Sequence, residues 1–192
     1  MTEKEKLKKS DTLLQRYIDR KACLKLRLKV GDEELSITGF LLTKSDEFLF
    51  IQDVNDFTYD GYVLIRRPDV GTIAHGRNEQ MRKKILKGEG MLGEAYGYKG
   101  HMPLNSWKAI FDTLKKEDTH TVIRSVYKDE AEFWIGPIKR ATEKRVAIHH
   151  YDATGAFNTK ATTLNYEEIR MVYFGDRYST TFRKYLKPFP KK

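Results

Sequence analysis

Two short stretches of the sequence each contain several basic residues spaced as on one face of a helix. Lysine and arginine neutralise phosphates, and aromatic rings stack on unpaired bases, so basic residues interleaved with aromatic ones suit single-stranded nucleic acid. The first set is Arg82, Lys83, Lys84 and Lys87, and the second is Arg177, Arg183, Lys184 and Lys187, interleaved with Tyr178, Tyr185 and Phe189. A solvated helix face whose aliphatic stems cover apolar surface is the alternative. The residue types alone leave both interpretations open.

A glycine motif in the middle of the chain has the spacing of a dinucleotide-binding loop. Residues 88–93 read G-E-G-M-L-G. Such a motif holds pyrophosphate when a strand precedes it and a helix N-terminus follows it. Here a basic helical stretch precedes it and further glycines follow. We therefore interpret the motif as a flexible linker and expect no cofactor.

The other residues suited to chemistry are a histidine pair and an acidic loop. His149 and His150 fall in an expected strand, where neighbouring side chains point to opposite faces and cannot hold one metal together. We expect one to face the core and the other solvent. Asp53, Asp56 and Asp60 lack the spacing of a calcium loop, and a turn explains them. No nucleophile, base and orienting group can be connected, so we expect neither an enzyme nor a metal site.

The composition favours a globular protein with a basic surface. The 192 residues include 36 Lys and Arg against 27 Asp and Glu, a net charge of +9, and 40% are hydrophobic. A basic balance favours polyanions, but the acidic groups are interspersed, so solubility explains the charge equally well. Cys23 is the single cysteine, which excludes an intramolecular disulfide. The sequence lacks an apolar signal region and any run of ~20 apolar residues, so we expect a cytoplasmic protein without membrane contact.

The first half of the chain has the pattern of a small β-rich unit. Short apolar runs rich in Val, Ile, Phe and Tyr alternate with polar turns, which is typical of antiparallel strands. The expected order is a charged lead at 1–9, a helix from Ser10 or Asp11 with Leu14, Tyr17 and Ile18 on one face, five strands within 22–75, and a helix at Asn78–Lys87. Repeated glycines then mark residues 88–104 as an interdomain linker.

The same pattern recurs 97 residues later. The repeat is carried by Asp129-Glu130, Gly136 and Ile148, which are spaced as Asp32-Glu33, Gly39 and Ile51 are. The expected elements are a helix from Asn105 or Ser106 with Trp107, Ile110, Phe111 and Leu114 on one face, strands at about 120–128, 131–141, 144–151, 157–164 and 168–174, and a helix at Tyr178–Leu186. We expect the Trp107 face to seal the end of a barrel. The expected domains are 10–87 and 105–187, joined by the linker 88–104.

A helix followed by five short strands, with glycine in the long second strand, favours a small closed barrel. We expect Gly39 and Gly136 where that strand bends sharply, since a Cβ would obstruct the curvature. The first copy also resembles the two motifs of the Sm-like family, which includes bacterial Hfq. The resemblance is carried by Leu26-x-Leu28-x-x-Gly31, Gly39-x-Leu41, Ser45-Asp46, Phe48 and the segment Ile65–Ile73, in which Arg67 stands where glycine is usual. It implies a mainly β fold with short helices: two tandem five-stranded Sm-like (SH3-like) small barrels, each with an N-terminal helix and a trailing short helix.

The resemblance implies an RNA-binding fold without the usual base pocket. Sm-like proteins read uridine with an asparagine in the third loop and an arginine in the fifth. The third-loop region here is Phe48-Leu49-Phe50, and only Arg66 keeps its place. The Tyr-Lys-His run of Hfq is absent as well. We therefore expect RNA or single-stranded nucleic acid to be bound by phosphate contacts and stacking. The expected binding residues are Arg66, Arg82, Lys83, Arg177, Tyr178, Arg183, Lys184 and Tyr185.

The resemblance also bears on strand pairing. In Sm rings the closing strand of one subunit pairs with the fourth strand of the next, and two copies in one chain could make that pairing internally. Strand edges that stay unpaired invite a second copy of the chain or another protein. A structural protein that oligomerises or docks a protein partner through such edges is therefore the alternative function.

Overall fold

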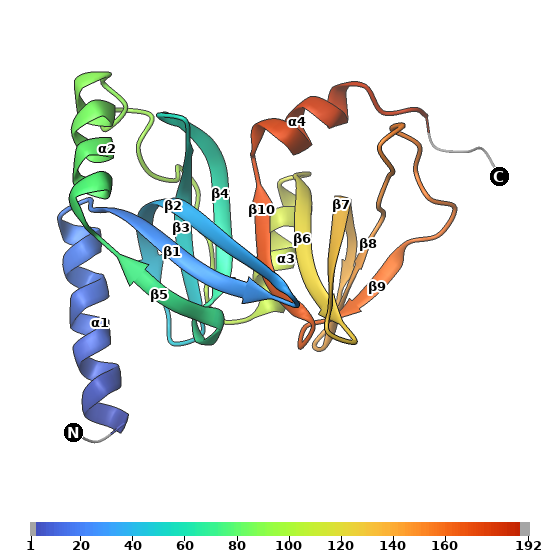
Figure 1. Cartoon of the computed structure of the whole chain (residues 1–192). Helices are drawn as coiled ribbons and strands as arrows, with labels where there is room; N and C mark the ends of the chain where they lie inside the picture. Colours follow the sequence, from blue (N-terminus) through green and yellow to red (C-terminus); the bar gives the residue numbers. More distant parts are fainter. Residues whose placement is uncertain (1–2, 189–192) are drawn as a thin grey trace.

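The computed structural model describes residues 3–188, with side chains from Ser10 onward, and this range is mainly β with short helices (Figure 1). The first half contains α1 (Glu3–Asp19), β1 (Cys23–Val30), β2 (Glu33–Lys44), β3 (Phe48–Asn55), β4 (Thr58–Arg66), the 3-10 turn η1 (Arg67–Asp69), β5 (Val70–Ala74) and α2 (Arg77–Gly88). The second half contains α3 (Trp107–Lys116), β6 (His120–Tyr127), β7 (Glu130–Ala141), β8 (Arg145–Ile148), β9 (Thr162–Asn165), β10 (Ile169–Phe174) and α4 (Arg177–Lys184). Within this range no helix combines the length and the apolar character needed to cross a bilayer.

Alternation of apolar and charged residues forms the strands as expected. In β1, Leu24, Leu26 and Leu28 are buried, whereas Arg27 and Lys29 are exposed. A period of two places the leucines on one face of the sheet. That face packs beneath α1 in a shared hydrophobic cluster.

All ten strands belong to one antiparallel sheet in the order β5-β1-β2-β3-β4-β10-β6-β7-β8-β9. Each half therefore has the same internal order, in which its fifth strand is followed by its first, second, third and fourth. The halves join where β4 pairs with β10, for example Ile65 with Met171. The closing strand of the second half thus pairs with the fourth strand of the first, inside one chain. The expected closure into two barrels is not confirmed, since among the described residues β5 pairs only with β1 and β9 only with β8.

The pairing registers repeat along with the sequence. Leu24 lies opposite Gly39 in the first half, and Thr121, 97 residues after Leu24, lies opposite Gly136. A further match is Leu41 opposite Ile51 with Ile138 opposite Ile148. The pairing of the fifth strand with the first is offset by two residues, because Ile73, opposite Leu26, and Val172, opposite Ile123, are 99 residues apart. A slip of one residue would turn every side chain to the other face of the sheet. The two halves therefore share one backbone scaffold.

Gly39 and Gly136 lie at matching close approaches between the second and third strands of each half. A Cβ on Gly39 would lie 2.2 Å from the carbonyl oxygen of Gln52, and one on Gly136 would lie 2.2 Å from that of His149. Backbone on the facing strand cannot withdraw without breaking the ladder. Glycine at these two positions therefore permits the approach, as expected from the bend.

The N-terminal helix begins earlier than expected. α1 starts at Glu3 rather than at Ser10 or Asp11, because the first residues are rich in Lys and Glu, which have high helix propensity. Asp11 therefore does not cap the helix. Its carboxylate instead lies 2.6 Å from Lys44 Nζ and 3.0 Å from Arg67 Nη1, which ties α1 to β2 and η1.

The third and fourth strands of the second half are shorter than the expected 144–151 and 157–164. The segment between them forms a turn in which Asp152 Oδ1 accepts hydrogen bonds from the backbone N–H groups of Thr154 (2.8 Å) and Ala156 (3.1 Å). Local side-chain bonds of this kind compete with strand pairing. The second half consequently has a long irregular β8–β9 loop where the first half has a tight β3–β4 turn.

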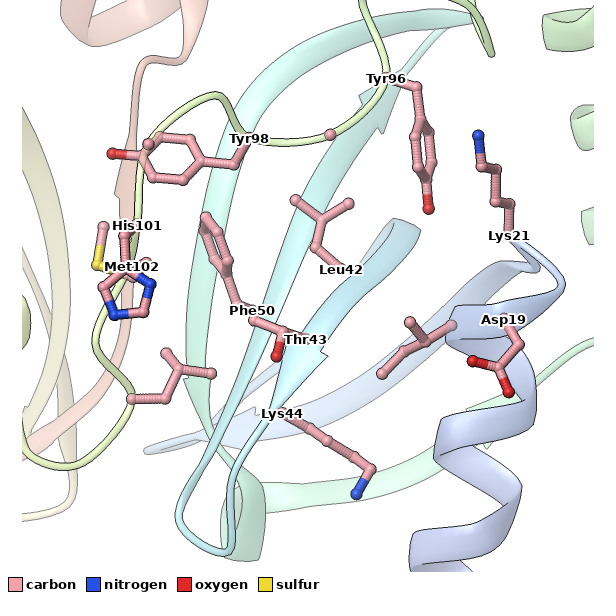
Figure 2. A pocket seen from close by; sticks show the side chains of 14 residues that line it. Asp19, Lys21, Leu42, Thr43, Lys44, Phe50, Tyr96, Tyr98, His101 and Met102 are labelled. Atoms are coloured by element: carbon pink, nitrogen blue, oxygen red, sulfur yellow. The ribbon is translucent and has the colours of Figure 1, made fainter.

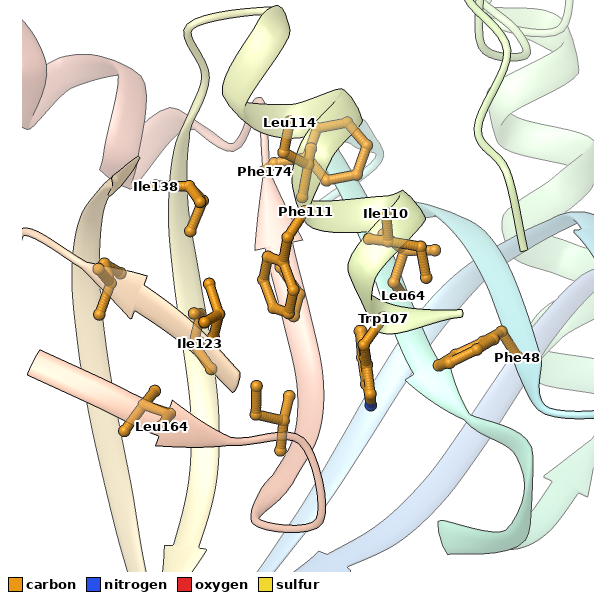
Figure 3. Close-up of a cluster of buried hydrophobic side chains, with 14 of the residues drawn as sticks. Phe48, Leu64, Trp107, Ile110, Phe111, Leu114, Ile123, Ile138, Leu164 and Phe174 are labelled. Carbon is orange, nitrogen blue, oxygen red and sulfur yellow. The ribbon is translucent and has the colours of Figure 1, made fainter. Parts of the chain in front are cut away.

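The hydrophobic core is divided unevenly between the halves. A first-half cluster lies under α1 and takes Met171 from β10. A junction cluster combines the buried face of α3 and the strands of the second half with Phe48, Phe50 and Leu64 of the first half (Figure 3). The centre of the Trp107 ring lies 4.7 Å from that of Phe48. The α3 face, expected to seal a barrel end, thus also holds the two halves together.

Candidate nucleic-acid interface

α4 carries five of the eight expected binding residues. Arg177, Tyr178, Arg183 and Lys184 lie in the helix and Tyr185 follows as its C-cap. The helix begins here because Asp176 Oδ1 accepts a hydrogen bond from Ser179 N at 2.8 Å, which satisfies one of the free N–H groups of the first turn. Tyr178 is 51% exposed and Tyr185 is 78% exposed. Rings this exposed contribute little to the core and remain accessible for stacking.

The two arginines of α4 differ in whether their side chains have a partner in the fold. The Arg183 guanidinium pairs with the Asp118 carboxylate and also donates to the Asp118 carbonyl oxygen, so it ties α4 to the turn before β6. Arg177 donates its backbone N–H to Asp60 Oδ1 at 2.7 Å, which fixes the start of α4 to β4, while the residue itself is exposed. Phe189 lies outside the described residues.

The other basic helix does not join this surface. Figure 1 shows α2 beside the first half and α4 over the second. The Arg82 guanidinium carbon lies 5.2 Å from the centre of the Phe57 ring, and Lys83 Nζ donates to the carbonyl oxygen of Arg20 at 2.6 Å. Arg82 and Lys83 are thus held against the β3–β4 turn and the end of α1, whereas Lys84 and Lys87 are exposed.

Arg66 lies apart from both basic helices, at the end of β4. Its Nε is 3.9 Å from Asp69 Oδ2. Burial raises the pKa of Asp69, and the positive charges of Arg66 and Arg170 oppose that rise. Arg66 also lines a hollow of about 310 Å³ at the junction of the halves, together with Trp107 and Tyr166. The structure therefore divides the expected residues among three places.

The glycine motif at residues 88–93 continues from α2 into a series of turns. No helix N-terminus follows it there, so the arrangement that binds pyrophosphate is not formed. The segment is nevertheless anchored rather than flexible. Tyr59 Oη donates to the carbonyl oxygen of Met91 at 2.8 Å, and Tyr62 Oη donates to that of Gly97 at 2.9 Å.

The histidine pair lies beyond the end of β8, although the backbone remains paired with β7 on both sides of it, through His149 N to Pro137 O and Tyr151 N to Ile135 O. His149 Nε2 is 2.7 Å from the backbone oxygen of Asn158, and His150 Nε2 is 2.9 Å from Asn158 Nδ2. Both rings are half-buried, which corrects the expectation of one core-facing and one solvent-facing side chain. Among the side chains that the structure describes, residues 10–188, no three His, Cys, Asp or Glu groups form a potential metal site.

The three residues of the acidic loop, Asp53, Asp56 and Asp60, do not all lie together in the fold. Asp56 lies in the β3–β4 turn, whereas Asp53 and Asp60 join Asp176 and Tyr178 around a hollow of about 380 Å³ between the halves. Burial raises the pKa of Asp53 to about 6, and the negative charges of Asp60 and Asp176 add to the rise. The meeting of Asp176 with this loop depends on β4–β10 pairing, which sequence spacing does not reveal.

A cavity that the sequence did not suggest lies between the end of α1, the β2–β3 region and the segment 96–104 (Figure 2). Its volume is about 620 Å³, within the range of small-ligand sites, roughly 300–1,000 Å³. Its lining includes Lys21, Lys44, Phe50, Tyr96, Tyr98 and His101. Two tyrosines inside a glycine-rich stretch were the available signal, because a solvated linker has no need of large rings.

Comparisons of the chain with protein-family models, with curated proteins and with solved structures each returned no match. The geometry of the chain itself therefore carries the functional proposal.

Proposed function

We propose that the chain is a non-enzymatic protein that binds RNA or another single-stranded nucleic acid through α4. The observation that carries the proposal is the pair of exposed rings, Tyr178 and Tyr185, beside cations on one short helix. Such rings can stack on bases without leaving the core, and the neighbouring cations neutralise phosphates. Phe133 meets Tyr178 edge-on, with ring centres 6.2 Å apart, which positions that ring while half of it stays exposed.

Each half is further proposed to be an Sm-like small barrel. The shared strand order, the glycine at each close approach and the pairing of a fourth strand with a closing strand support this reading. The base pocket of that family is not part of the proposal, because the third loop lacks its asparagine. Binding is therefore expected to depend weakly on sequence.

A salt titration with a random RNA pool tests the proposal. Affinity should fall steeply from low to moderate salt, because each phosphate contact to a single strand contributes about 0.7 to the slope of log affinity against log salt. A variant with Arg177→Gln and Lys184→Gln should lower that slope by up to about 1.4 and weaken all sequences alike. Arg183 is kept, since its loss would also free Asp118.

The matched control removes two exposed lysines elsewhere, in a variant with Lys29→Gln and Lys128→Gln. It changes the net charge equally, so it separates a local contact from general attraction. Circular dichroism checks that both variants are folded. No binding by the wild type at low salt would refute the proposal, and equal losses in the two variants would refute the role of α4.

A second candidate function is an interaction protein that pairs through strand edges. The observation that favours it is the sheet order, which within the described residues leaves a fifth strand, β5, at one end and a fourth strand, β9, at the other. Strands in these same two roles pair at the junction, so a second copy could add by the same pairing. Complexes that grow with protein concentration in sedimentation velocity favour this candidate, and a monomer throughout contradicts it.

A further inference from the structure

We infer that the cavity beside Tyr96 binds one nucleotide unit, a base with its phosphate, and that in the cell this unit belongs to an RNA strand. The inference rests on the RNA-binding function proposed above and adds a second, deeper contact in the first half of the chain. It is argued from the fixed walls of the cavity, its rings and its charges.

The wall formed by residues 96–104 is fixed by hydrogen bonds rather than by regular secondary structure, whereas α1, β2 and β3 form the others. Gln52 is only 2% exposed, and its amide makes two bonds to the loop that carries Tyr96. Gln52 Nε2 donates to the carbonyl oxygen of Ala95 at 2.9 Å, and Gly97 N donates to Gln52 Oε1 at 2.8 Å. A buried amide satisfied on both sides holds its partners in one arrangement. The cavity is therefore formed before any ligand arrives, which lowers the entropic cost of binding.

The rings around the cavity are held in the same way. The Tyr98 ring packs edge-on against Phe50 with centres 5.3 Å apart, and its hydroxyl donates to the Glu117 carboxylate at 2.7 Å. The Tyr96 ring packs edge-on against Phe40 at 5.5 Å. Figure 2 shows the two tyrosines on opposite sides of the cavity with Leu42 and Phe50 between them. A flat apolar base suits a site bounded by rings and a leucine.

The charges at the rim favour an anionic group. Lys21 is exposed, has no acidic partner among the described residues, and places its Nζ 4.3 Å from the centre of the Tyr96 ring. Lys44 and Arg67 are both held by Asp11, which leaves one net positive charge among the three. The charged Asp19 carboxylate accepts a hydrogen bond from Gln15. Lys21 is therefore the cation available to a phosphate, beside the ring on which a base would stack.

The surroundings of the cavity allow the strand to continue. Lys83 Nζ donates to the carbonyl oxygen of Arg20, the residue before Lys21, so the basic face of α2 lies next to the rim. The next phosphate of the strand would meet Lys83. In this inference the basic face of α2, which does not join the α4 surface, contacts the RNA strand beside the cavity.

Two variants and two matched controls test the inference. Tyr96→Ala should weaken binding of a short RNA about tenfold or more, as expected for the loss of one stacked base. Lys21→Gln should lower the salt slope by about 0.7, one phosphate contact. The controls are Tyr127→Ala and Lys128→Gln, because Lys128 Nζ lies 5.4 Å from the Tyr127 ring centre, away from the cavity. They should leave affinity and slope unchanged.

A parallel titration with free nucleoside monophosphates separates the two sources of this chemistry. Weak binding of a monophosphate that Tyr96→Ala abolishes, together with weaker RNA binding by the same variant, supports the inference. If RNA binds and both cavity variants behave like their controls, the inference fails while the proposed function stands. If monophosphates bind and RNA does not, both the RNA strand and the proposed function are refuted. Lys21→Gln alters an exposed side chain, so it decides the outcome if Tyr96→Ala fails to fold.

Discussion

The two halves of the molecule share their strand registers but differ in their hydrophobic clusters and loops. The first half has its own cluster beneath α1 and a tight β3–β4 turn. The second half replaces that turn with a long loop and depends on the junction cluster, to which the first half contributes Phe48, Phe50 and Leu64. The scaffold thus repeats, while stability and binding surfaces arise from parts that do not. Substitutions at equivalent positions should therefore give unequal effects.

Phe50→Ala should have the largest effect. Its ring is buried and lies within 6.0 Å, centre to centre, of the Tyr62, Tyr98 and Phe174 rings. Removing it from the junction should lower the free energy of unfolding by about 3–5 kcal/mol. Urea unfolding should remain a single transition, because the junction cluster contains residues of both halves and is lost when either half unfolds.

The two tryptophans make this test selective. Trp107 and Trp134 both lie in the second half, so their fluorescence reports that half, whereas far-UV circular dichroism reports the whole chain. In Phe50→Ala, a first-half substitution, both signals should shift to lower urea together. Phe50→Leu, which leaves a smaller void, is the control and should shift both by less. Two separated transitions would show that the halves unfold independently.

Gly39→Ala and Gly136→Ala test the same close approach between two strands in each half of the chain. Each adds a Cβ 2.2 Å from a facing carbonyl oxygen. Gly39 faces Gln52 within the β2–β3 ladder, whereas Gly136 faces His149, beyond the end of β8. The backbone opposite Gly136 is nevertheless paired, since His149 N donates to the Pro137 carbonyl oxygen and Tyr151 N to that of Ile135. Gly136 also has a φ of +158°, which disfavours a Cβ. We therefore expect about 3 kcal/mol of destabilisation at Gly39 and more at Gly136. Equal losses in urea unfolding would contradict the difference between the halves.

The sequence predicts the parts of this fold that depend on local pattern. Alternation gives the strands, the face of α3 is read from helical spacing, and the repeat correctly matches Gly39 with Gly136. Single-sheet order and the position of Asp176 beside Asp53 depend on β4–β10 pairing, which no local pattern encodes and which only the Sm-like resemblance suggests. The cavity was missed because buried hydrogen bonds of Gln52 build it, and a lone Gln in an apolar strand has no distinctive signature.

The smallest expected effect is a pair of opposite pH dependences at equivalent positions. Asp53 and His150 are 97 residues apart and face Gly39 and Gly136. Burial raises the pKa of Asp53 from 3.8 to about 6 and lowers that of His150 from 6.5. Both groups are thus pushed towards their neutral forms. The raised acid pKa destabilises the fold as pH rises from about 4 to 6, whereas the lowered histidine pKa destabilises it as pH falls below about 6.5.

Asp53→Asn should isolate the first of these dependences. Below about pH 4 the carboxyl is protonated in both folded and unfolded chains, so the variant and wild type should be equally stable. Above pH 6 the variant should be more stable by about 2 kcal/mol, which is the pKa shift converted at 1.36 kcal/mol per unit and reduced for partial exposure. His150 is present in both proteins, so its contribution cancels in the difference. Asp56→Asn, in the exposed β3–β4 turn, is the control, and a flat Asp53 difference curve between pH 3.5 and 7 would mean that this carboxyl stays hydrated in the fold.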